Sequence, residues 1–317
     1  MLEEICLKLE KLVSDAVSNC KSDCIALSGG LDSSILAFCL GNKKIRGIVT
    51  VTKDFPSVDL VHSQLVAKQT DLQLDVKTAS IVDLVHAIEE TIKILKVFNP
   101  IEIRNSIVMY LTMNLAKEKG FTSIITGDGA DELFAGYSFF QRKQGEELQK
   151  DLERIWKVMH FPTLQIGKSL GIDVQTPFLN EKVVEYAKSI PADLKVHQER
   201  GKKYGKWILR KAFEKILPES ITWREKSAMQ DGSGTTGLTS FFENLIIDSV
   251  YADKLKLYNE TEQVKLESKE SLYYYEIYRK YYKPPVFLGS SKSRCPNCQA
   301  IKEVDSHFCR MCGSFPI

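Results

Sequence analysis

The stretch that decides the fold reads Ser28-Gly29-Gly30-Leu31-Asp32-Ser33-Ser34. It follows a short apolar run at 24–27 and precedes an apolar, helical-looking segment at 35–40. Its two glycines allow the backbone to approach an anion closely, and the amides at the start of the following helix point toward that anion. Its three serines add hydroxyl donors. The stretch therefore predicts a pyrophosphate-binding loop between a strand and a helix.

Asp32 gives this loop a second property. A carboxylate repels bare phosphate, but Mg²⁺ bound between the carboxylate and the phosphate oxygens removes the repulsion. The stretch lacks the lysine of a Walker A loop, so it suits release of pyrophosphate after attack at the α-phosphorus of ATP. The alternative interpretation is an ordinary Gly- and Ser-rich turn with a helix cap.

A second polar loop follows a predicted strand and reads Thr126-Gly127-Asp128-Gly129-Ala130-Asp131-Glu132-Leu133-Phe134-Ala135-Gly136-Tyr137. In a parallel sheet this loop lies at the same edge as the first one. Acidic residues repel ATP, but Asp131 and Asp32 together can hold the Mg²⁺ that neutralises the pyrophosphate. Thr126 and Gly127 lie where the backbone can contact the nucleotide. Taken alone, the loop is also compatible with an acidic, solvated turn.

Apolar runs alternate with helical patterns in the first half of the chain. The expected strands lie at 23–27, 45–51, 73–77 and 122–126, with helices near 57–69, 80–95 and 102–119. An amphipathic first helix is marked by Leu2, Ile5, Leu9, Leu12 and Ala16. This rhythm predicts an α/β fold with a doubly wound parallel sheet. From about residue 140 onward the pattern is mostly helical.

The composition favours a cytoplasmic enzyme. The chain has 317 residues, of which 26% are charged and 44% hydrophobic, and its net charge of +2 gives no general attraction to nucleic acid. No run of roughly 18 apolar residues predicts a membrane span. The acidic N-terminus lacks the charged region of a signal peptide.

The eight cysteines form two groups. Cys6, Cys20, Cys24 and Cys39 are scattered in apolar contexts and are expected to be reduced thiols. The other four form two Cys-x-x-Cys pairs separated by ten residues, namely Cys295, Cys298, Cys309 and Cys312. This spacing predicts a closed, structural Zn²⁺ site, and Gly313 supplies the permissive backbone of the second turn. His307 is expected to be a surface residue.

The chain is expected to divide at a linker. Two prolines, followed by Gly and Ser residues, occupy 283–293 and stop the preceding helix. We therefore expect a main domain at 1–282 and a zinc ribbon at 294–317. A segment this short cannot bury enough apolar surface to fold alone, so metal binding would provide its folding free energy.

The first loop resembles the one that follows the first strand of the doubly wound sheet in the ATP-pyrophosphatase (PP-loop) superfamily. That resemblance implies conversion of ATP to AMP and pyrophosphate. With the second loop, the chain resembles the synthetase domain of the asparagine synthetase family over much of residues 20–235. Two weaker matches are the segment at 103–106, which carries Arg104, and the segment at 223–226, which carries Lys226 and precedes Asp231-Gly232.

In that family a carboxylate, such as that of aspartate, attacks ATP to give an acyl-adenylate, and ammonia then displaces AMP to form an amide. The resemblance implies that Arg104 is catalytic and that Lys226 stabilises negative charge. Asp128, where the family often has Glu, would act on the incoming amine or position the acyl-adenylate. The residues implied to hold pyrophosphate and Mg²⁺ are Ser28, Gly29, Gly30, Asp32, Ser33, Ser34 and Asp131, and those implied to contact AMP are Val51, Thr126 and Gly127.

The chain also departs from the family pattern. The usual N-terminal glutaminase begins with a cysteine at position 2, whereas this chain has Leu2 and reaches its first loop by residue 28. Ammonia is therefore expected from solution or from a separate glutaminase subunit, unless the nucleophile is another group. Asp173, Gln175 and Asn180 differ from a family segment that shapes the acceptor side.

Three hypotheses remain open. The first is an ATP-dependent ligase that forms an amide on aspartate or a similar small carboxylate. The second is a tRNA-modifying enzyme that adenylates a base, with the ribbon binding RNA through Lys292, Arg294, Lys302 and Arg310. The third is a catalytically silent protein whose ribbon recruits a partner, and the intact first loop speaks against it.

Overall fold

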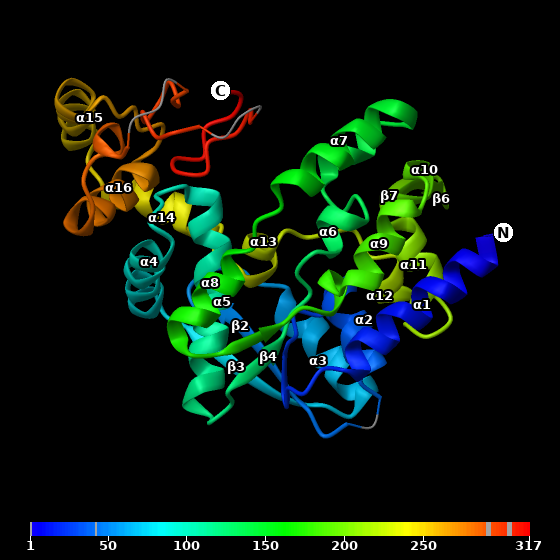
Figure 1. Cartoon of the computed structure of the whole chain (residues 1–317). Coiled ribbons are helices and arrows are strands. Elements are labelled where there is room, and N and C mark those ends of the chain that lie inside the picture. The colour runs from blue at the N-terminus through cyan, green and yellow to red at the C-terminus, as the bar shows by residue number, and fades with distance from the viewer. Residues whose placement is uncertain (1, 42, 290–292, 303–305) are drawn as a thin grey trace. The chain divides into compact units, whose positions relative to one another are not determined.

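The computed structural model describes residues 2–41, 43–289, 293–302 and 306–317. Residue contacts divide the chain into two compact units. The first comprises Met1–Val51, Val58–Lys77 and Thr112–Ala228, and the second comprises Thr52–Ser57, Thr78–Leu111 and Met229–Ile317. The path of the chain through both can be followed by colour in Figure 1.

The first unit holds the sheet, most of its helices and a short hairpin. Its strands are β1 (Cys24–Ala26), β2 (Arg46–Thr52), β3 (Gln73–Ala79), β4 (Ser123–Ile125), β5 (Asp173–Gln175), β6 (Val196–Glu199) and β7 (Lys202–Gly205), where β2 and β3 end in the second unit. Its helices are α1 (Leu2–Ser18), α2 (Leu31–Cys39), α3 (Asp59–Thr70), α6 (Ala130–Leu133), α7 (Gly145–Val158), α8 (Pro162–Leu170), α9 (Glu181–Ser189), α10 (Ala192–Lys195), α11 (Trp207–Phe213) and α12 (Glu219–Thr222). Two 3₁₀ turns, η1 (Ser138–Arg142) and η2 (Pro177–Leu179), complete it.

The second unit is helical. It holds α4 (Ile81–Leu95), the first part of α5 (Pro100–Glu118), α13 (Met229–Ser233), α14 (Gly237–Leu245), α15 (Asp248–Glu262), α16 (Lys269–Tyr281) and the 3₁₀ turn η3 (Pro285–Phe287). Aromatic rings of α16 form much of its interior, and Phe98 lies on Tyr275 and Tyr278 with ring centroids 4.8 and 5.4 Å away. In the described parts of the chain, no helix is both long enough and apolar enough to cross a membrane.

The sheet confirms the predicted fold class. Its five strands lie in the order β3-β2-β1-β4-β5, and β1 pairs in parallel with both β2 and β4. The direction of winding reverses between β1 and β4, and in such sheets a ligand binds outside the carboxyl ends of the strands at that point. The two loops singled out in the sequence follow β1 and β4 directly.

The predicted strands and helices of the first half are present within a few residues of their expected bounds. The expectation of a mostly helical second half missed β5 and the β6–β7 hairpin. β5 is only three residues long, too short for an alternating pattern, yet it completes the sheet by pairing with β4. The residues of the two hairpin strands are mostly polar and carry no apolar alternation.

The core of the first unit lies between the sheet and its helices. Buried apolar residues of α1, α2, α9 and α11 form one cluster with Ile25 and Leu27. Ile25 lies in β1, and Leu27 follows the end of that strand. α1 contacts both α9 and α11, and the three helices lie together in Figure 1. This packing fixes the strand that leads into the first loop.

The cysteine segment belongs to the second unit by its contacts. The boundaries expected at 282 and 294 stay a prediction. Residues 290–292 of the expected linker, including Lys292, and residues 303–305 of the expected ribbon lie outside the described residues.

Candidate active site

The first loop leaves β1 and turns directly into α2. Gly30 caps the helix in an extended conformation without a side-chain hydrogen bond to the first turn. The Ser28 hydroxyl accepts a hydrogen bond from the Gly30 amide at 3.3 Å and lies 3.2 Å from the Ser33 hydroxyl. Ser34 is fully buried, and its hydroxyl has no hydrogen-bond partner among the residues that the structure describes. The start of α2 thus presents amides and hydroxyls of the kind that bind an anion.

Gly29 is required at its position for two reasons. Its φ is +69°, in the left-handed region that favours glycine. A Cβ there would lie 2.3 Å from the carbonyl carbon of His62 in α3. The first loop therefore packs against the backbone of α3 in a way that no other residue permits.

The second loop lies against the first one. A Cβ on Gly127 would lie 3.1 Å from the Cβ of Asp32. Gly129 has a φ of +95° and begins the short helix α6, which carries Asp131. The structure thus brings together the two loops that the sequence predicted to share one edge of the sheet.

Lys206 joins the two aspartates, and sequence reasoning missed it. Its ammonium lies 2.5 Å from Oδ2 of Asp32 and 2.6 Å from Oδ1 of Asp131, and only 5% of the side chain is exposed. Its backbone amide donates to the carbonyl of Phe134 at 2.9 Å, which ties the start of α11 to the second loop. Gly136 leaves the necessary space, because a Cβ there would lie 2.3 Å from Cε of Lys206.

The electrostatics of this group follow from burial and charge pairing. Burial favours a neutral Asp131, but the ammonium groups of Lys206 and Lys226 outweigh burial and hold the pKa of Asp131 below its usual range. Burial and the nearby Asp131 raise the pKa of Asp32 despite its contact with Lys206. Burial lowers the pKa of Lys206, but the two carboxylates outweigh it and keep that pKa above its ordinary value.

The aspartates fit a site for a divalent cation. Both carboxylates converge on a single cationic group, the Lys206 ammonium. The second oxygen of Asp32, Oδ1, is buried and has no hydrogen-bond partner in the described part of the chain. Carboxylate oxygens are the ligands that Mg²⁺ takes in nucleotide sites. Asp32 and Asp131 are therefore the residues of this loop pair that would hold Mg²⁺.

Asp128 is partly buried and lies in the second loop, three residues before Asp131. Its Oδ2 accepts a hydrogen bond from the Thr126 hydroxyl at 2.7 Å, and its Oδ1 accepts one from the Thr163 hydroxyl at 3.2 Å. Burial raises the pKa of Asp128 in spite of these two hydrogen bonds. A buried carboxyl group with a raised pKa is suited to taking up a proton.

Lys226 lies beside the second loop. Its ammonium contacts Asp131 and lies 4.6 Å from the centre of the Tyr137 ring, a cation–π contact. Tyr137 in turn donates a 2.5 Å hydrogen bond to Glu132. Burial lowers the pKa of Lys226, and the positive charge of Lys206 adds to this effect against the attraction of Asp131.

Other residues support the first loop from outside the two motifs. Arg224 donates a hydrogen bond to the carbonyl of Gly29 at 3.3 Å. Burial raises the pKa of Asp59 at the start of α3 to about 7, against the opposing charge of Arg224. Val51, expected to contact AMP, is 4% exposed near the end of β2, the strand beside β1. The expected contact of Val51 with AMP stays a prediction.

Arg104 belongs to the second unit. Its guanidinium donates to Glu270 at 2.6 Å, to Thr239 at 2.6 Å and to Gln230 at 2.8 Å. None of these partners is a residue that the sequence predicted for the site. The catalytic role of Arg104 therefore rests on the resemblance alone.

Gln175, one of the departures from the family pattern, is used inside the first unit. Its side-chain oxygen accepts a 2.8 Å hydrogen bond from the Lys21 amide, and its nitrogen donates to Asp173 at 2.9 Å. The side chain thus ties the segment before β1 to β5.

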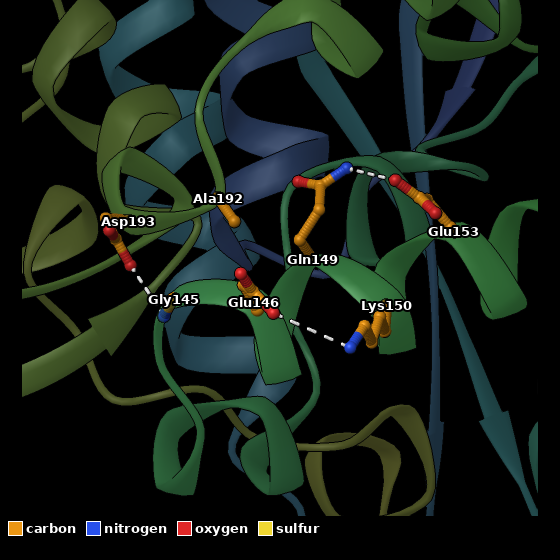
Figure 2. Close-up of a pocket in the computed structure, with 7 residues that line it drawn as sticks. All are labelled: Gly145, Glu146, Gln149, Lys150, Glu153, Ala192 and Asp193. Carbon is orange, nitrogen blue, oxygen red and sulfur yellow. Dashed lines mark hydrogen bonds and ion pairs between the residues drawn. The ribbon is translucent and has the colours of Figure 1, made fainter.

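A shallow pocket between α7 and α10 contains none of the predicted residues (Figure 2). Figure 2 shows the Asp193 carboxylate accepting a hydrogen bond from the Gly145 amide, at 3.0 Å, and Glu146 paired with Lys150 at 3.6 Å. The Gln149 side chain also donates to Glu153, so these polar groups have partners within the pocket. We assign no ligand to it.

The second unit holds a separate candidate metal site. The sulfur atoms of Cys295, Cys298, Cys309 and Cys312 all lie within 4.8 Å of one another. The fold therefore brings together the two Cys-x-x-Cys pairs as their spacing predicted, and the early cysteines are free thiols, as expected.

Comparisons with known proteins agree with the two loops. A Dictyostelium discoideum protein named probable asparagine synthetase (glutamine-hydrolyzing) is 31% identical in an alignment 260 residues long, which covers 73% of this chain and 47% of that protein. The Gallus gallus asparagine synthetase (glutamine-hydrolyzing) is 31% identical in an alignment 275 residues long, which covers 81% of this chain and 48% of that protein. This chain spans about half the length of these relatives.

A solved structure, NMN synthetase from Francisella tularensis, is 14% identical, and the match covers 88% of this chain and 93% of that one with a TM-score of 0.36. The asparagine synthase family matches residues 8–165 and 146–285. These two segments include both loops, Lys206 and Lys226. The chain therefore belongs to the asparagine synthase family.

Proposed function

We propose that this protein is an ATP-dependent ligase that adenylates a small carboxylate, aspartate or a close analogue, and transfers ammonia to it. The observation that carries this proposal is the convergence of Asp32 and Asp131 on one cationic group beside the helix start that follows Gly30. A loop that binds pyrophosphate and two carboxylates that accept a cation suit cleavage of ATP between its α- and β-phosphorus atoms. Mg²⁺, when held by the two aspartates, supplies the charge that offsets the phosphates.

The roles of the protein groups follow from their positions. The amides and hydroxyls at the start of α2 bind the pyrophosphate that leaves. Lys226 offsets the negative charge that grows at the α-phosphorus while the substrate carboxylate attacks it, since a cation already held in position stabilises such developing charge. Asp128 takes the proton that the incoming amine loses as the new C–N bond forms and the bond to AMP breaks.

The source of nitrogen is part of the same proposal. We infer that free ammonia, or ammonia delivered by a separate glutaminase subunit, is the nucleophile. The relatives bear names that specify glutamine hydrolysis, and this chain spans about half of their length. Zn²⁺ at the four late cysteines is proposed as a structural ion, because all four thiols occupy ligand positions and leave none open.

Exchange of labelled pyrophosphate into ATP tests the adenylation half-reaction. With Mg²⁺ present, we expect exchange only when a carboxylic acid such as aspartate is added. Asp128→Asn should keep this exchange while amide formation falls by about 10²-fold or more, because only the second step uses the carboxylate as a base. The exposed Glu146→Gln variant is the matched control and should behave as the wild type. Exchange stimulated by tRNA and by no carboxylate would favour base adenylation instead.

A further inference from the structure

The cysteine segment of the second unit builds the same turn twice. In the first turn the Gln299 amide donates to the Cys295 carbonyl at 3.0 Å, and in the second the Gly313 amide donates to the Cys309 carbonyl at 2.8 Å. Both Gln299 and Gly313 have left-handed backbones, with φ of +59° and +86°. The amide of each leading cysteine also donates five residues ahead, to Ala300 and to Ser314. Two equivalent Cys-x-x-Cys turns are typical of a structural Zn²⁺ site.

The distances between thiols fit one tetrahedral ion. Cys295 and Cys312 have sulfur atoms 3.8 Å apart, and Cys298 and Cys309 have sulfur atoms 3.6 Å apart. A regular tetrahedron with Zn–S bonds of about 2.3 Å requires sulfur separations of about 3.8 Å. Three of the four residues are buried. The thiols are thus arranged around one metal position rather than paired as disulfides, whose sulfur atoms lie about 2 Å apart.

The first turn docks on the segment that leads into α16. The carbonyl of Asn297 accepts a hydrogen bond from the Lys265 amide at 2.7 Å, and its side-chain nitrogen donates to Glu267 at 2.9 Å. Three residues beyond Glu267, the first turn of α16 carries Glu270. The first cysteine turn therefore holds the loop from which α16 starts.

The second turn docks on the segment that leads into α5. The carbonyl of Met311 accepts a hydrogen bond from the Phe98 amide at 2.9 Å. Asn99, 1% exposed, caps α5 by accepting a hydrogen bond from the Ile101 amide at 3.1 Å. Gly313 lies against that cap, because a Cβ there would be 2.6 Å from the Asn99 side-chain oxygen. The second cysteine turn therefore holds the start of α5.

These two helices supply the two partners of one buried ion pair. Arg104 lies in α5, near its start, and contacts Glu270 of α16 at 2.6 Å. Only 12% of the Arg104 side chain and 2% of the Glu270 side chain are exposed. A buried pair of this kind depends on accurate placement of both partners, since misplacing one leaves an uncompensated charge.

Two cations of the cysteine segment, Arg294 and Lys302, have partners within the second unit. The Arg294 guanidinium donates to the carbonyls of Gln299 at 2.6 Å, Gly289 at 2.7 Å and Pro285 at 3.4 Å. The Lys302 ammonium lies 3.3 Å from the carbonyl of Ile317. This use of the cations supports an internal role for the segment.

We propose that Zn²⁺, bound by Cys295, Cys298, Cys309 and Cys312, clamps the starts of α5 and α16 and so holds the Arg104–Glu270 ion pair in place. Each cysteine turn fixes one helix start, and the shared ion fixes the two turns relative to each other. The clamp is a structural claim about the second unit. Its importance for catalysis rests on the proposed ligase function together with the family resemblance, which implies a catalytic Arg104.

Hydrogen exchange measured by mass spectrometry tests the clamp without measuring turnover. The purified full chain should contain about one zinc ion per molecule. After zinc removal with a chelator, peptides covering 96–103 and 263–272 should exchange at least tenfold faster, because the Phe98 and Lys265 amides lose their acceptors. Peptides covering 24–34 and 123–134 in the first unit should not change. Readdition of Zn²⁺ should restore protection, and Cys20→Ser is the control for thiol modification.

A second variant separates docking from metal binding. Gly313→Ala keeps all four ligands but places a Cβ against Asn99. We expect it to retain its zinc ion while 96–103 exchanges at least tenfold faster and 263–272 is unchanged. Gly201→Ala is the matched control, because Gly201 also has a left-handed φ, of +79°, but nothing lies within 4 Å of its Cβ.

Two results would overturn the clamp. One is a chain purified without zinc that binds none when it is added. The other is a chain whose cysteine turns exchange faster on zinc removal while 96–103 and 263–272 keep their protection. Either result leaves the pyrophosphate exchange assay unaffected, so failure of the clamp and failure of the proposed ligase function are distinguishable.

Discussion

Two lysines are almost completely buried in the first unit, and their surroundings differ. Lys206, 4% exposed, lies between Asp32 and Asp131 at the two loops. Lys195, 0% exposed, ends α10 with its ammonium nitrogen 4.5 Å from the Trp156 ring centre and without a hydrogen-bond partner in the described part of the chain. Burial lowers the pKa of Lys195 to about 7, whereas two carboxylates keep the pKa of Lys206 above its ordinary value.

The difference shows what makes the loop pair a binding site. A cation is stable between the loops because two carboxylates compensate for its burial, and the same carboxylates can hold a metal ion. Among the described residues only an aromatic ring contacts the Lys195 ammonium, so about half of the amine is neutral near pH 7. The loop pair stabilises the charged form of Lys206, whereas the surroundings of Lys195 do not stabilise its charged form.

Asp131→Asn should produce the largest effect on activity. It removes one proposed metal ligand and the shared partner of Lys206 and Lys226. We expect AMP formation to fall on the order of 10³-fold or more, as for loss of a major electrostatic group at the reacting phosphate. Glu146→Gln, an exposed change on α7, is the control. Near-normal turnover of Asp131→Asn would show that the carboxylate has no part in ATP cleavage.

The free energy of unfolding of Lys206→Met tests whether Lys206 compensates the charges of Asp32 and Asp131. It leaves two partly buried carboxylates without their common partner, and loss of the partner of a buried charge costs about 3–5 kcal/mol as an upper bound for this site. In this variant the carboxylate pKa values rise above their unfolded values, so the penalty is small below about pH 4 and grows as the pH rises toward 7. Denaturant unfolding at both pH values measures it. A penalty independent of pH would mean that the pair does not depend on Lys206.

Of the three variants, Lys195→Met should have the smallest effect. Its effect on the free energy of unfolding should depend on pH. The pKa of Lys195 is about 7 in the folded protein and higher in the unfolded chain. Between these two pH values the unfolded wild type binds more protons than the folded one, so the stability of the wild type rises with pH. The variant lacks this rise. The free energy of unfolding of the variant minus that of the wild type should therefore fall by about 2 kcal/mol from pH 7.5 to 9.5. An unchanged difference would show that Lys195 stays charged when folded.

The sequence was sufficient for features that are local. The loops at 28–34 and 126–137 each carry their own glycines and polar groups, so their conformations and their common sheet edge were predictable. The Cys-x-x-Cys turns are local in the same sense. Gly313 was recognised as the permissive residue of its turn, but Gln299 plays the same part without a composition signal.

Long-range placement was not predictable. Lys206 follows a charged hairpin that no pattern marked, and only the turn of the chain after β7 brings it to the aspartates. In the sequence it is one of three lysines within five residues, a composition typical of a solvated surface. The docking of the cysteine turns on Phe98 and Lys265 likewise joins segments about 30 to more than 200 residues apart, which no spacing rule connects.

The central claim is that the two loops together hold ATP for cleavage between its first and second phosphorus atoms. Incubation of the wild-type chain with ATP, Mg²⁺, ammonium and aspartate, followed by ³¹P NMR of the products, tests it most directly. We expect AMP and pyrophosphate in equal amounts, and neither product from Asp131→Asn. Formation of ADP and phosphate by the wild type would contradict it.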